Sequence, residues 1–110
     1  MAIVFVCSPF SGDIARTTER ARGYCRFVLS HDCVPFAPHL HNPQFLDEYI
    51  PRERKIGIEL GLEVLKRTDA LWVFGGRITD GMREEIRYAT ENQIPVKYFD
   101  ENCLEVENYG

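Results

Sequence analysis

The 110-residue sequence predicts a single α/β domain, residues 1–110, in which a parallel sheet lies between two layers of helices. Strand-like and helix-like segments alternate four times, and only the last helix is missing. The first and third strand-like runs, residues 2–7 and 70–74, are apolar throughout, as in strands buried on both faces. Right-handed crossovers then favour strand order 2-1-3-4, which describes a flavodoxin- or Rossmann-like three-layer sandwich.

The amino-terminal half supplies two strands and one helix. After the strand at residues 2–7, Asp13 is a good N-cap for a helix whose apolar stripe continues to Val28. Residues 33–37 form a short apolar run that contains Pro35. Because proline cannot donate to a sheet ladder, this run is expected to be an edge strand.

The remaining elements follow a stretch without periodicity. Residues 38–51 hold three of the six prolines and two of the three histidines, which predicts a long loop. A helix follows over residues 51–67, then the strand at 70–74, a third helix and a strand at 95–99. The core-facing residues of the third helix are Met82, Ile86 and Ala89. The last eleven residues form an acidic tail for which no structure is predicted.

Two loops should meet where the strand order reverses, namely residues 8–13 after the first strand and residues 75–82 after the third. Ligands of such sheets bind at this edge, and glycines there let the backbone approach a ligand and leave helix amides free for an anion. The candidate ligand-binding residues in the second loop are Gly75, Gly76 and Gly81. His39 and Asn42, from the long loop, are further candidates, and simple solvent exposure is the alternative for His39.

Glu85 is the candidate catalytic carboxylate. It follows core Met82 by three residues and precedes core Ala89 by four, so it lies beside the buried stripe, whereas Glu84 faces water. Its place near the start of a helix favours the ionised form. The alternative explanation is that the carboxylate only complements the helix dipole.

Charge and hydropathy exclude several classes of protein. With 13 Lys and Arg against 17 Asp and Glu, the formal charge of −4 argues against binding to duplex nucleic acid. No apolar run approaches the roughly 20 residues that span a bilayer, and no basic flank precedes the first apolar stretch as in a signal peptide. We therefore expect a cytoplasmic protein that binds neither membranes nor duplex nucleic acid.

The cysteines and histidines offer two weaker interpretations. Eight residues separate Cys7 from Arg16, too many for the phosphate cradle of low-molecular-weight phosphatases, where five intervene. His31, Cys33, His39 and His41 lack the spacing of common zinc sites. We expect no metal and no cofactor, and reduced, buried thiols at the four cysteines.

The segment TDALWVFGGRITDGMREEIRYATENQIPV resembles the signature of the nucleoside 2-deoxyribosyltransferase-like superfamily. The matching residues of this segment are Asp69, Asp80-Gly81, Glu85-Ile86, Ala89 and Pro95-Val96. The opening VFVCSPFSGD is similar to the first strand and loop of the family, with Ser8, Pro9 and Phe10 at matching positions. The closest resemblance is to short bacterial or phage-encoded members.

The resemblance implies retaining N-glycosyl transfer or hydrolysis on a nucleoside or nucleotide. Glu85 would attack the anomeric carbon of a ribosyl or deoxyribosyl unit, and water or another base would resolve the covalent intermediate. Asp80 would orient the sugar. Ser8 and Gly12 would donate hydrogen bonds from the loop that contains Pro9, and Phe10 would stack on the base. The family also implies a homodimer or higher homo-oligomer, to which tail residues such as Tyr109 could contribute.

One departure from the family pattern keeps a second function open. Members carry a further acid about two turns before the acid that precedes strand three, and this chain has Gly61 there. The alternative is therefore a non-catalytic binder or sensor of a nucleotide-derived ligand. A phospho-receiver module is disfavoured because Gly75-Gly76 and Ser8-Pro9 replace the acids that such modules need.

Overall fold

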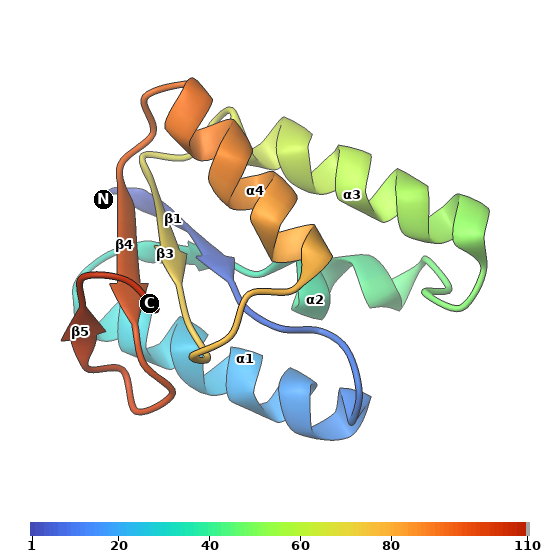
Figure 1. The fold of residues 1–110 in the computed structure, drawn as a ribbon, viewed down its shortest axis with the longest axis horizontal. Coiled ribbons are helices and arrows are strands. Elements are labelled where there is room, and N and C mark those ends of the chain that lie inside the picture. Colours follow the sequence, from blue (N-terminus) through green and yellow to red (C-terminus); the bar gives the residue numbers. More distant parts are fainter. Residues whose placement is uncertain (110) are drawn as a thin grey trace.

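A computed structural model of the chain, which describes residues 1–109, contains one five-stranded sheet of order β2-β1-β3-β4-β5 (Figure 1). The strands are β1 (Ile3–Cys7), β2 (Val34–Phe36), β3 (Ala70–Val73), β4 (Val96–Phe99) and β5 (Glu105–Val106). The helices are α1 (Ile14–Ser30), α2 (Pro38–His41), the 3-10 helix η1 (Asn42–Gln44), α3 (Pro51–Leu65) and α4 (Asp80–Glu91). The first four strands are parallel, which confirms the predicted α/β sandwich and the order 2-1-3-4.

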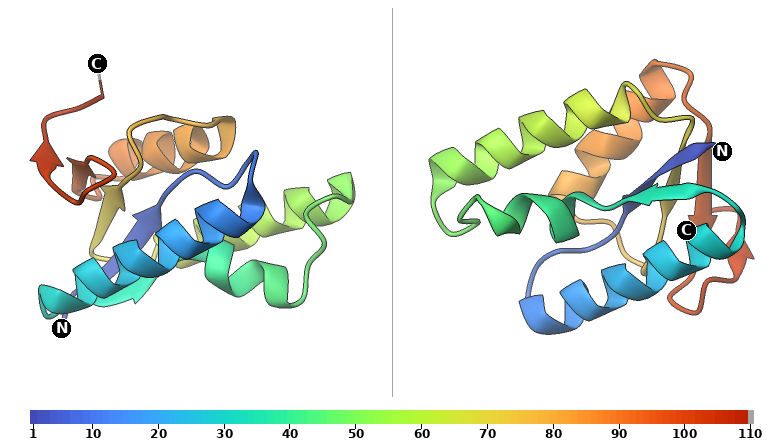
Figure 2. Two further views of the ribbon diagram at one scale, coloured as in Figure 1. Left: turned by 90° about the horizontal axis from the view of Figure 1, so that it is seen from below. Right: turned by 180° about the vertical axis from the view of Figure 1, so that it is seen from behind.

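The helices cover the two faces of the sheet unequally. Helix α1 lies on one face, and α3 and α4 lie together on the other (Figures 1 and 2). Alternate side chains of β1 enter the two cores, because Val4 and Val6 pack with Tyr24 and Val28 of α1 while Phe5 packs toward α3 and α4. The apolar runs of β1 and β3 therefore reflect burial on both faces, as the sequence predicts.

The carboxyl ends of β1 and β3 lie side by side, since the register pairs Cys7 with Val73. The loops that follow both strands lead directly into helices with side-chain caps. Asp13 caps α1 by accepting a hydrogen bond from the Arg16 amide at 3.1 Å, and Thr79 caps α4. The first turns of α1 and α4 thus open onto the same edge of the sheet, one on each face.

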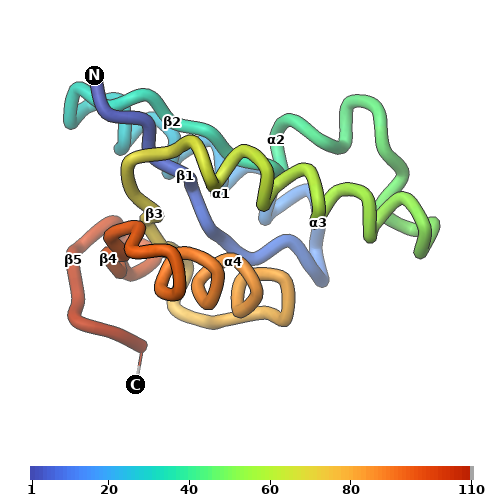
Figure 3. Tube along the Cα trace, turned by 90° about the horizontal axis from the view of Figure 1, so that it is seen from above, coloured from blue at the N-terminus to red at the C-terminus, as the bar shows by residue number. Residues whose placement is uncertain are grey.

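The prediction of a long loop over residues 38–51 is wrong in its first half, where α2 and η1 form. Each begins with a proline in its first turn, a position where the missing amide donor costs nothing. The Asn42 side chain then donates to the Gly57 carbonyl at 3.2 Å and ties this segment to α3. The trace in Figure 3 shows the segment running out beside α3 before the chain turns back.

The carboxyl-terminal tail also has structure that the sequence did not predict. Strand β5 pairs antiparallel with β4, and the Tyr109 hydroxyl donates to the Phe99 carbonyl at 2.6 Å. Of the four cysteines, all free thiols, only Cys7 is fully buried, so the expectation of burial is wrong for the other three. Among residues 1–109, no helix combines the length and apolar character needed to cross a membrane.

Candidate active site

Two pockets flank the loop between β1 and α1. The first, of about 270 Å³, opens on the side of α3 and α4, and its charged lining consists of Glu48, Glu53, Arg54, Asp80 and Glu85. The second, of about 340 Å³, opens on the side of α1, and its charged lining consists of Asp13, Arg16, Arg20, Arg77 and Glu101. We call them the acidic pocket and the basic pocket. Ser11, in the loop between them, lines both.

Glu85 lies in the acidic pocket on the second turn of α4, with its side chain partly buried. Burial raises the pKa of its carboxyl to about 7, and a hydrogen bond from the Cys7 thiol offsets part of that rise. A carboxyl with this pKa is close to half ionised at neutral pH. It can therefore act as a nucleophile or exchange a proton with a bound ligand.

Cys7 is a partner of Glu85 rather than a nucleophile of its own. Its side chain is fully buried at the end of β1, and its sulfur lies 4.0 Å from the Met82 carbonyl. Burial, followed by the neighbouring Glu85 charge, raises the pKa of the thiol well above its usual range. Cys7 consequently stays protonated, which is the reverse of what a phosphatase cysteine requires.

Asp80, the second candidate catalytic residue, stands at the first position of α4 and lines the mouth of the acidic pocket. Its side chain is 93% exposed and forms an ion pair with Arg83 at 2.8 Å. The exposed carboxylate is thus free to turn toward a ligand, since such a surface pair contributes little to stability.

His39 and Phe10 form one wall of the acidic pocket. Their rings stack with centroids 4.4 Å apart and planes 6° apart. The His39 Nε2 lies 2.8 Å from the Ser8 carbonyl oxygen and must carry the proton, because a carbonyl only accepts. Burial lowers the pKa of His39 to about 4, so the ring is neutral at physiological pH. The wall is therefore aromatic and uncharged.

The candidate residues from the sequence separate into three groups. Asn42 and Gly81 line the acidic pocket with Glu85, Asp80, Phe10 and His39. Pro9, Gly12 and Gly75 line the basic pocket instead. Ser8 is buried, and Gly76 belongs to the lining of neither pocket. One crevice was expected here, and the loop of residues 8–13 divides it.

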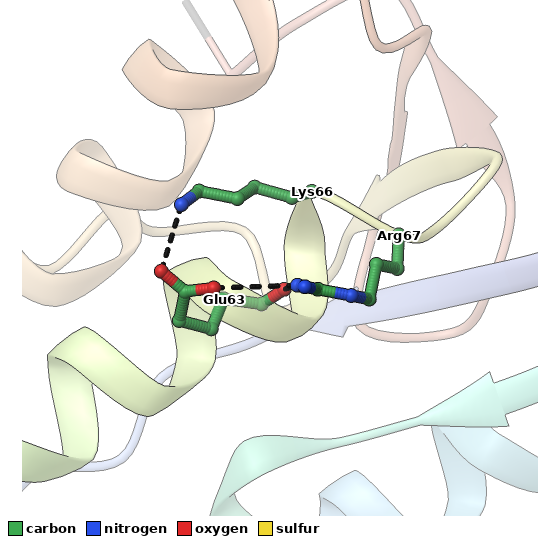
Figure 4. Close-up of polar contacts among 3 residues, drawn as sticks. All are labelled: Glu63, Lys66 and Arg67. Carbon is green, nitrogen blue, oxygen red and sulfur yellow. Dashed lines mark hydrogen bonds and ion pairs between the residues drawn. The ribbon is translucent and has the colours of Figure 1, made fainter.

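Gly61 faces Glu85 across the interface of α3 and α4. A Cβ atom at Gly61 would lie 3.8 Å from Glu85 Oε2 and 3.9 Å from the ring of Phe5. An acidic side chain at this position would point at Glu85. Glu63 cannot replace it, because its carboxylate is held on the surface by Lys66 at 2.7 Å and by Arg67 at 3.3 Å (Figure 4).

Sequence comparison assigns the family. Residues 2–99 match the model of a domain of unknown function, DUF7768. The chain belongs to this family. No curated protein matches the sequence.

The DUF7768 chain also resembles solved structures. One is a 2-deoxyribosyltransferase from the psychrotolerant bacterium Bacillus psychrosaccharolyticus, with a TM-score of 0.74 and 16% sequence identity over 98% of this chain and 88% of the other. At this identity the likeness establishes the fold and not the activity.

Sequence reasoning missed three charged residues of the acidic pocket in this DUF7768 domain. Glu48, Glu53 and Arg54 come from the segment read as loop and from the first turn of α3. Glu53 accepts a hydrogen bond from the Asp47 amide at 2.8 Å, and burial raises the pKa of Glu48. The clustering of charges around Pro51 was the available signal. Across residues 1–109, no group of three or more His, Cys, Asp or Glu side chains could hold a metal ion.

Proposed function

We propose that this DUF7768 protein cleaves or transfers the N-glycosidic bond of a nucleoside or nucleotide, with Glu85 as the nucleophile. The observation that carries the proposal is the Glu85 carboxyl, whose pKa is raised to about 7 within a pocket lined by further carboxylates. The pocket opens at the carboxyl edge of a sheet whose fold is shared with a 2-deoxyribosyltransferase. Ligands of open α/β sheets bind at this edge.

The proposed reaction has two steps. Ionised Glu85 attacks the anomeric carbon, a carbon–oxygen bond forms, and the carbon–nitrogen bond breaks with its electron pair leaving on the base, which takes up a proton from water. Water or a second base then displaces the carboxylate and restores Glu85. The anomeric carbon becomes positively charged in both transition states, and the carboxylates of Glu48, Glu53 and Asp80 stabilise that charge.

The other side chains receive roles from their positions. The stacked pair of Phe10 and His39 offers an aromatic wall for the leaving base. Asp80 orients a sugar hydroxyl once it turns away from Arg83. Asn42 donates one hydrogen of its amide nitrogen to the Gly57 carbonyl, so its second amide hydrogen and its side-chain oxygen are left for a ligand. Ser8 supports the site indirectly, through the carbonyl that holds His39.

A base-release assay tests the proposal. Wild-type protein is incubated with a panel of ribo- and deoxyribonucleosides and their 5′-monophosphates, and free base is quantified by chromatography. We expect release from at least one substrate and a loss of more than about 1,000-fold in Glu85→Gln, since the covalent step then has no nucleophile. Glu84→Gln, one residue away and exposed on the outer face of α4, is the matched control. Equal rates in wild type and Glu85→Gln would refute the mechanism.

The second candidate function is a non-catalytic binder of a nucleotide-derived ligand. Gly61 favours it, because the position that faces Glu85 across α3 carries no acid. Thermal-shift titrations with nucleotides and ADP-ribose-type ligands, run beside the base-release assay, separate the two. Tight binding without release of base from any substrate supports the binder.

We further propose that the protein acts in the cytoplasm as a homodimer or higher homo-oligomer. Large apolar side chains are exposed between η1 and the middle of α3, among them Phe45 at 56% and Tyr49 at 82%. Such a patch beside a pocket is typical of an interface. Tyr109 is less suited to reach a neighbour, since it binds its own Phe99. Sedimentation analysis of wild type and of Tyr49→Ser tests the assembly, and monomeric wild type contradicts it.

A further inference from the structure

The basic pocket is not used by the proposed reaction, yet it gathers three guanidinium groups. Arg16 and Arg20 lie four residues apart on α1, so they project from the same side of the helix. Arg77 reaches the pocket from the loop between β3 and α4. Two elements far apart in the sequence thus deliver positive charge to one cavity of about 340 Å³.

These guanidinium groups are poorly neutralised within the protein. Among the described residues, neither Arg16 nor Arg77 has a carboxylate within ion-pair distance, although the chain carries a net charge of −4. Arg77 reaches only the hydroxyl and carbonyl oxygens of Ser11, both at 3.4 Å. Two carboxylates also line the pocket: Glu101 lies 3.8 Å from Arg20, and Asp13 accepts a hydrogen bond from the backbone amide of Arg16 rather than from a guanidinium group. An anionic ligand would supply the missing counter-charge.

A buried hydroxyl group gives independent evidence for a ligand. The Tyr24 side chain is 3% exposed and lines the basic pocket, and among residues 1–109 no group accepts the proton of its hydroxyl. Burial raises the pKa of this hydroxyl, and a hydrogen bond from the Arg20 guanidinium to its oxygen offsets part of the rise, so the hydroxyl keeps its proton and can donate it to a ligand. Its ring stacks on Phe74 with centroids 4.5 Å apart, which fixes the direction of the hydroxyl.

The backbone around the pocket is shaped for close approach. Gly12 and Gly75 line it with φ angles of +79° and +103°, a region that other residues rarely adopt. A Cβ at Gly75 would meet the Pro9 ring at 2.7 Å and would also lie 3.8 Å from the Tyr24 hydroxyl. Glycine at position 75 therefore keeps the loops together and leaves the space before the hydroxyl open.

We propose that the basic pocket binds a phosphate group. Guanidinium groups pair with phosphate oxygens in a bidentate manner, and the Tyr24 hydroxyl supplies a further donor from the inner wall. The phosphate comes either from the free anion or from a nucleotide whose remainder lies in the acidic pocket, since Ser11 lines both pockets. The binding does not depend on the chemistry of Glu85.

Calorimetric titrations test the proposal with inorganic phosphate, a nucleoside 5′-monophosphate and the matching nucleoside. We expect Arg16→Ala and Arg77→Ala each to weaken the binding of phosphate-bearing ligands about tenfold or more, with a strong dependence on salt. Tyr24→Phe keeps the ring and loses severalfold in affinity. Arg22→Ala, an exposed arginine on the same helix that pairs with Glu19, is the matched control and leaves affinity unchanged. Circular dichroism verifies that each variant is folded.

Each pattern of results decides the matter. Binding of inorganic phosphate that the pocket variants weaken supports a site for the free anion. If the protein binds the monophosphate more tightly than the nucleoside, and Arg77→Ala removes this difference in affinity, the site binds the phosphate of the nucleotide. The proposal is overturned if phosphate does not increase the affinity of any ligand, or if the increase in affinity is the same in wild type and in the pocket variants. If the protein releases base from nucleosides but phosphate has no effect, the proposed enzyme activity is supported and the phosphate site is refuted. If the protein binds phosphate but releases no base, the phosphate site is supported and the enzyme activity is refuted.

Discussion

The acidic and basic pockets occupy the same edge of one sheet and differ in almost every physical respect. The acidic pocket lies on the face covered by α3 and α4, holds four carboxylates and one arginine, and partly buries one of the carboxylates, that of Glu85. The basic pocket lies on the face covered by α1 and holds three arginines and two carboxylates, all reached by solvent. The loop of residues 8–13 separates the two pockets, and Arg77 donates a hydrogen bond to the Ser11 hydroxyl of this loop.

The difference would allow one topological crevice to serve the two tasks that we propose. Burial in the acidic pocket favours the neutral forms of both Glu85 and His39, which raises the pKa of the acid and lowers that of the base. The exposed arginines of the basic pocket keep their charge. A site for covalent chemistry and a site for a permanent anion can therefore adjoin without a shared side chain other than Ser11.

The largest expected effect concerns the ionisation of Glu85. Because only the ionised carboxylate attacks, kcat/KM for base release should rise about tenfold per pH unit below pH 7 and level off above it, a gain of roughly 50-fold from pH 5 to pH 7 and roughly 100-fold to the plateau. The break follows from the Glu85 pKa of about 7. Glu84→Gln should leave the profile unchanged. A break near 4.5, the value of an exposed glutamate, would contradict the burial of the nucleophile.

The packing of the loop of residues 8–13 against the loop after β3 can be disrupted at Gly75. In Gly75→Ala the new Cβ would lie 2.7 Å from Pro9 Cδ at a φ of +103°, so both strain and overlap act, and we expect a loss of about 3 to 4 kcal/mol in the free energy of unfolding. Gly76→Ala is the control, because its φ is +79° with nothing within 4 Å of the Cβ, and it should lose about 1 kcal/mol. Urea denaturation measures both. Equal losses of stability in the two variants would mean that the close contact of Gly75 with Pro9 does not contribute to the packing of the two loops.

How much of this arrangement the sequence predicts depends on the signal that each element carries. Strands β1 and β3 are apolar on both faces, so their place at the centre of the sheet follows from pattern alone. Helices α2 and η1 are too short to show a period, and their prolines suggested a loop. Pattern identifies long elements, because their burial repeats. A short helix depends on particular contacts such as that of Asn42 with Gly57.

The candidate site shows the same limit. Glu85 could be placed beside the core from helical geometry, because its neighbours three and four residues away are buried. The division of the crevice could not be predicted, since it depends on the path of the loop at residues 8–13. The basic pocket did leave a signal, in that Arg16, Arg20 and Tyr24 recur every four residues along α1. That spacing places two positive charges and a hydroxyl on the same side of α1. A search for apolar residues alone does not detect this pattern.

The pH dependence of the free energy of unfolding should test the burial of Glu85 independently of any catalytic activity. Its pKa is higher in the folded protein, at about 7, than the ordinary 4.5, so the folded state binds more protons between these values and loses stability as the pH rises through them. Glu85→Gln removes this loss. The variant should be more stable than wild type by about 2 to 3 kcal/mol at pH 8 and equal to it at pH 4. A constant difference at both pH values would show that the carboxyl is not buried.

The smallest expected effect compares two tyrosine hydroxyls, one without a partner and one bonded. Tyr24→Phe removes a buried hydroxyl whose proton has no acceptor among residues 1–109, so the free energy of unfolding should stay level or rise by about 1 kcal/mol. Tyr109→Phe removes a hydroxyl that donates to the Phe99 carbonyl at 2.6 Å and should lower it by about 1 kcal/mol. Saturating phosphate should stabilise both proteins and the wild type by about 1 kcal/mol more, because a ligand bound in the basic pocket would accept the proton of the Tyr24 hydroxyl and so bind the wild type severalfold more tightly. If phosphate shifts both proteins equally, the Tyr24 hydroxyl does not face the anion.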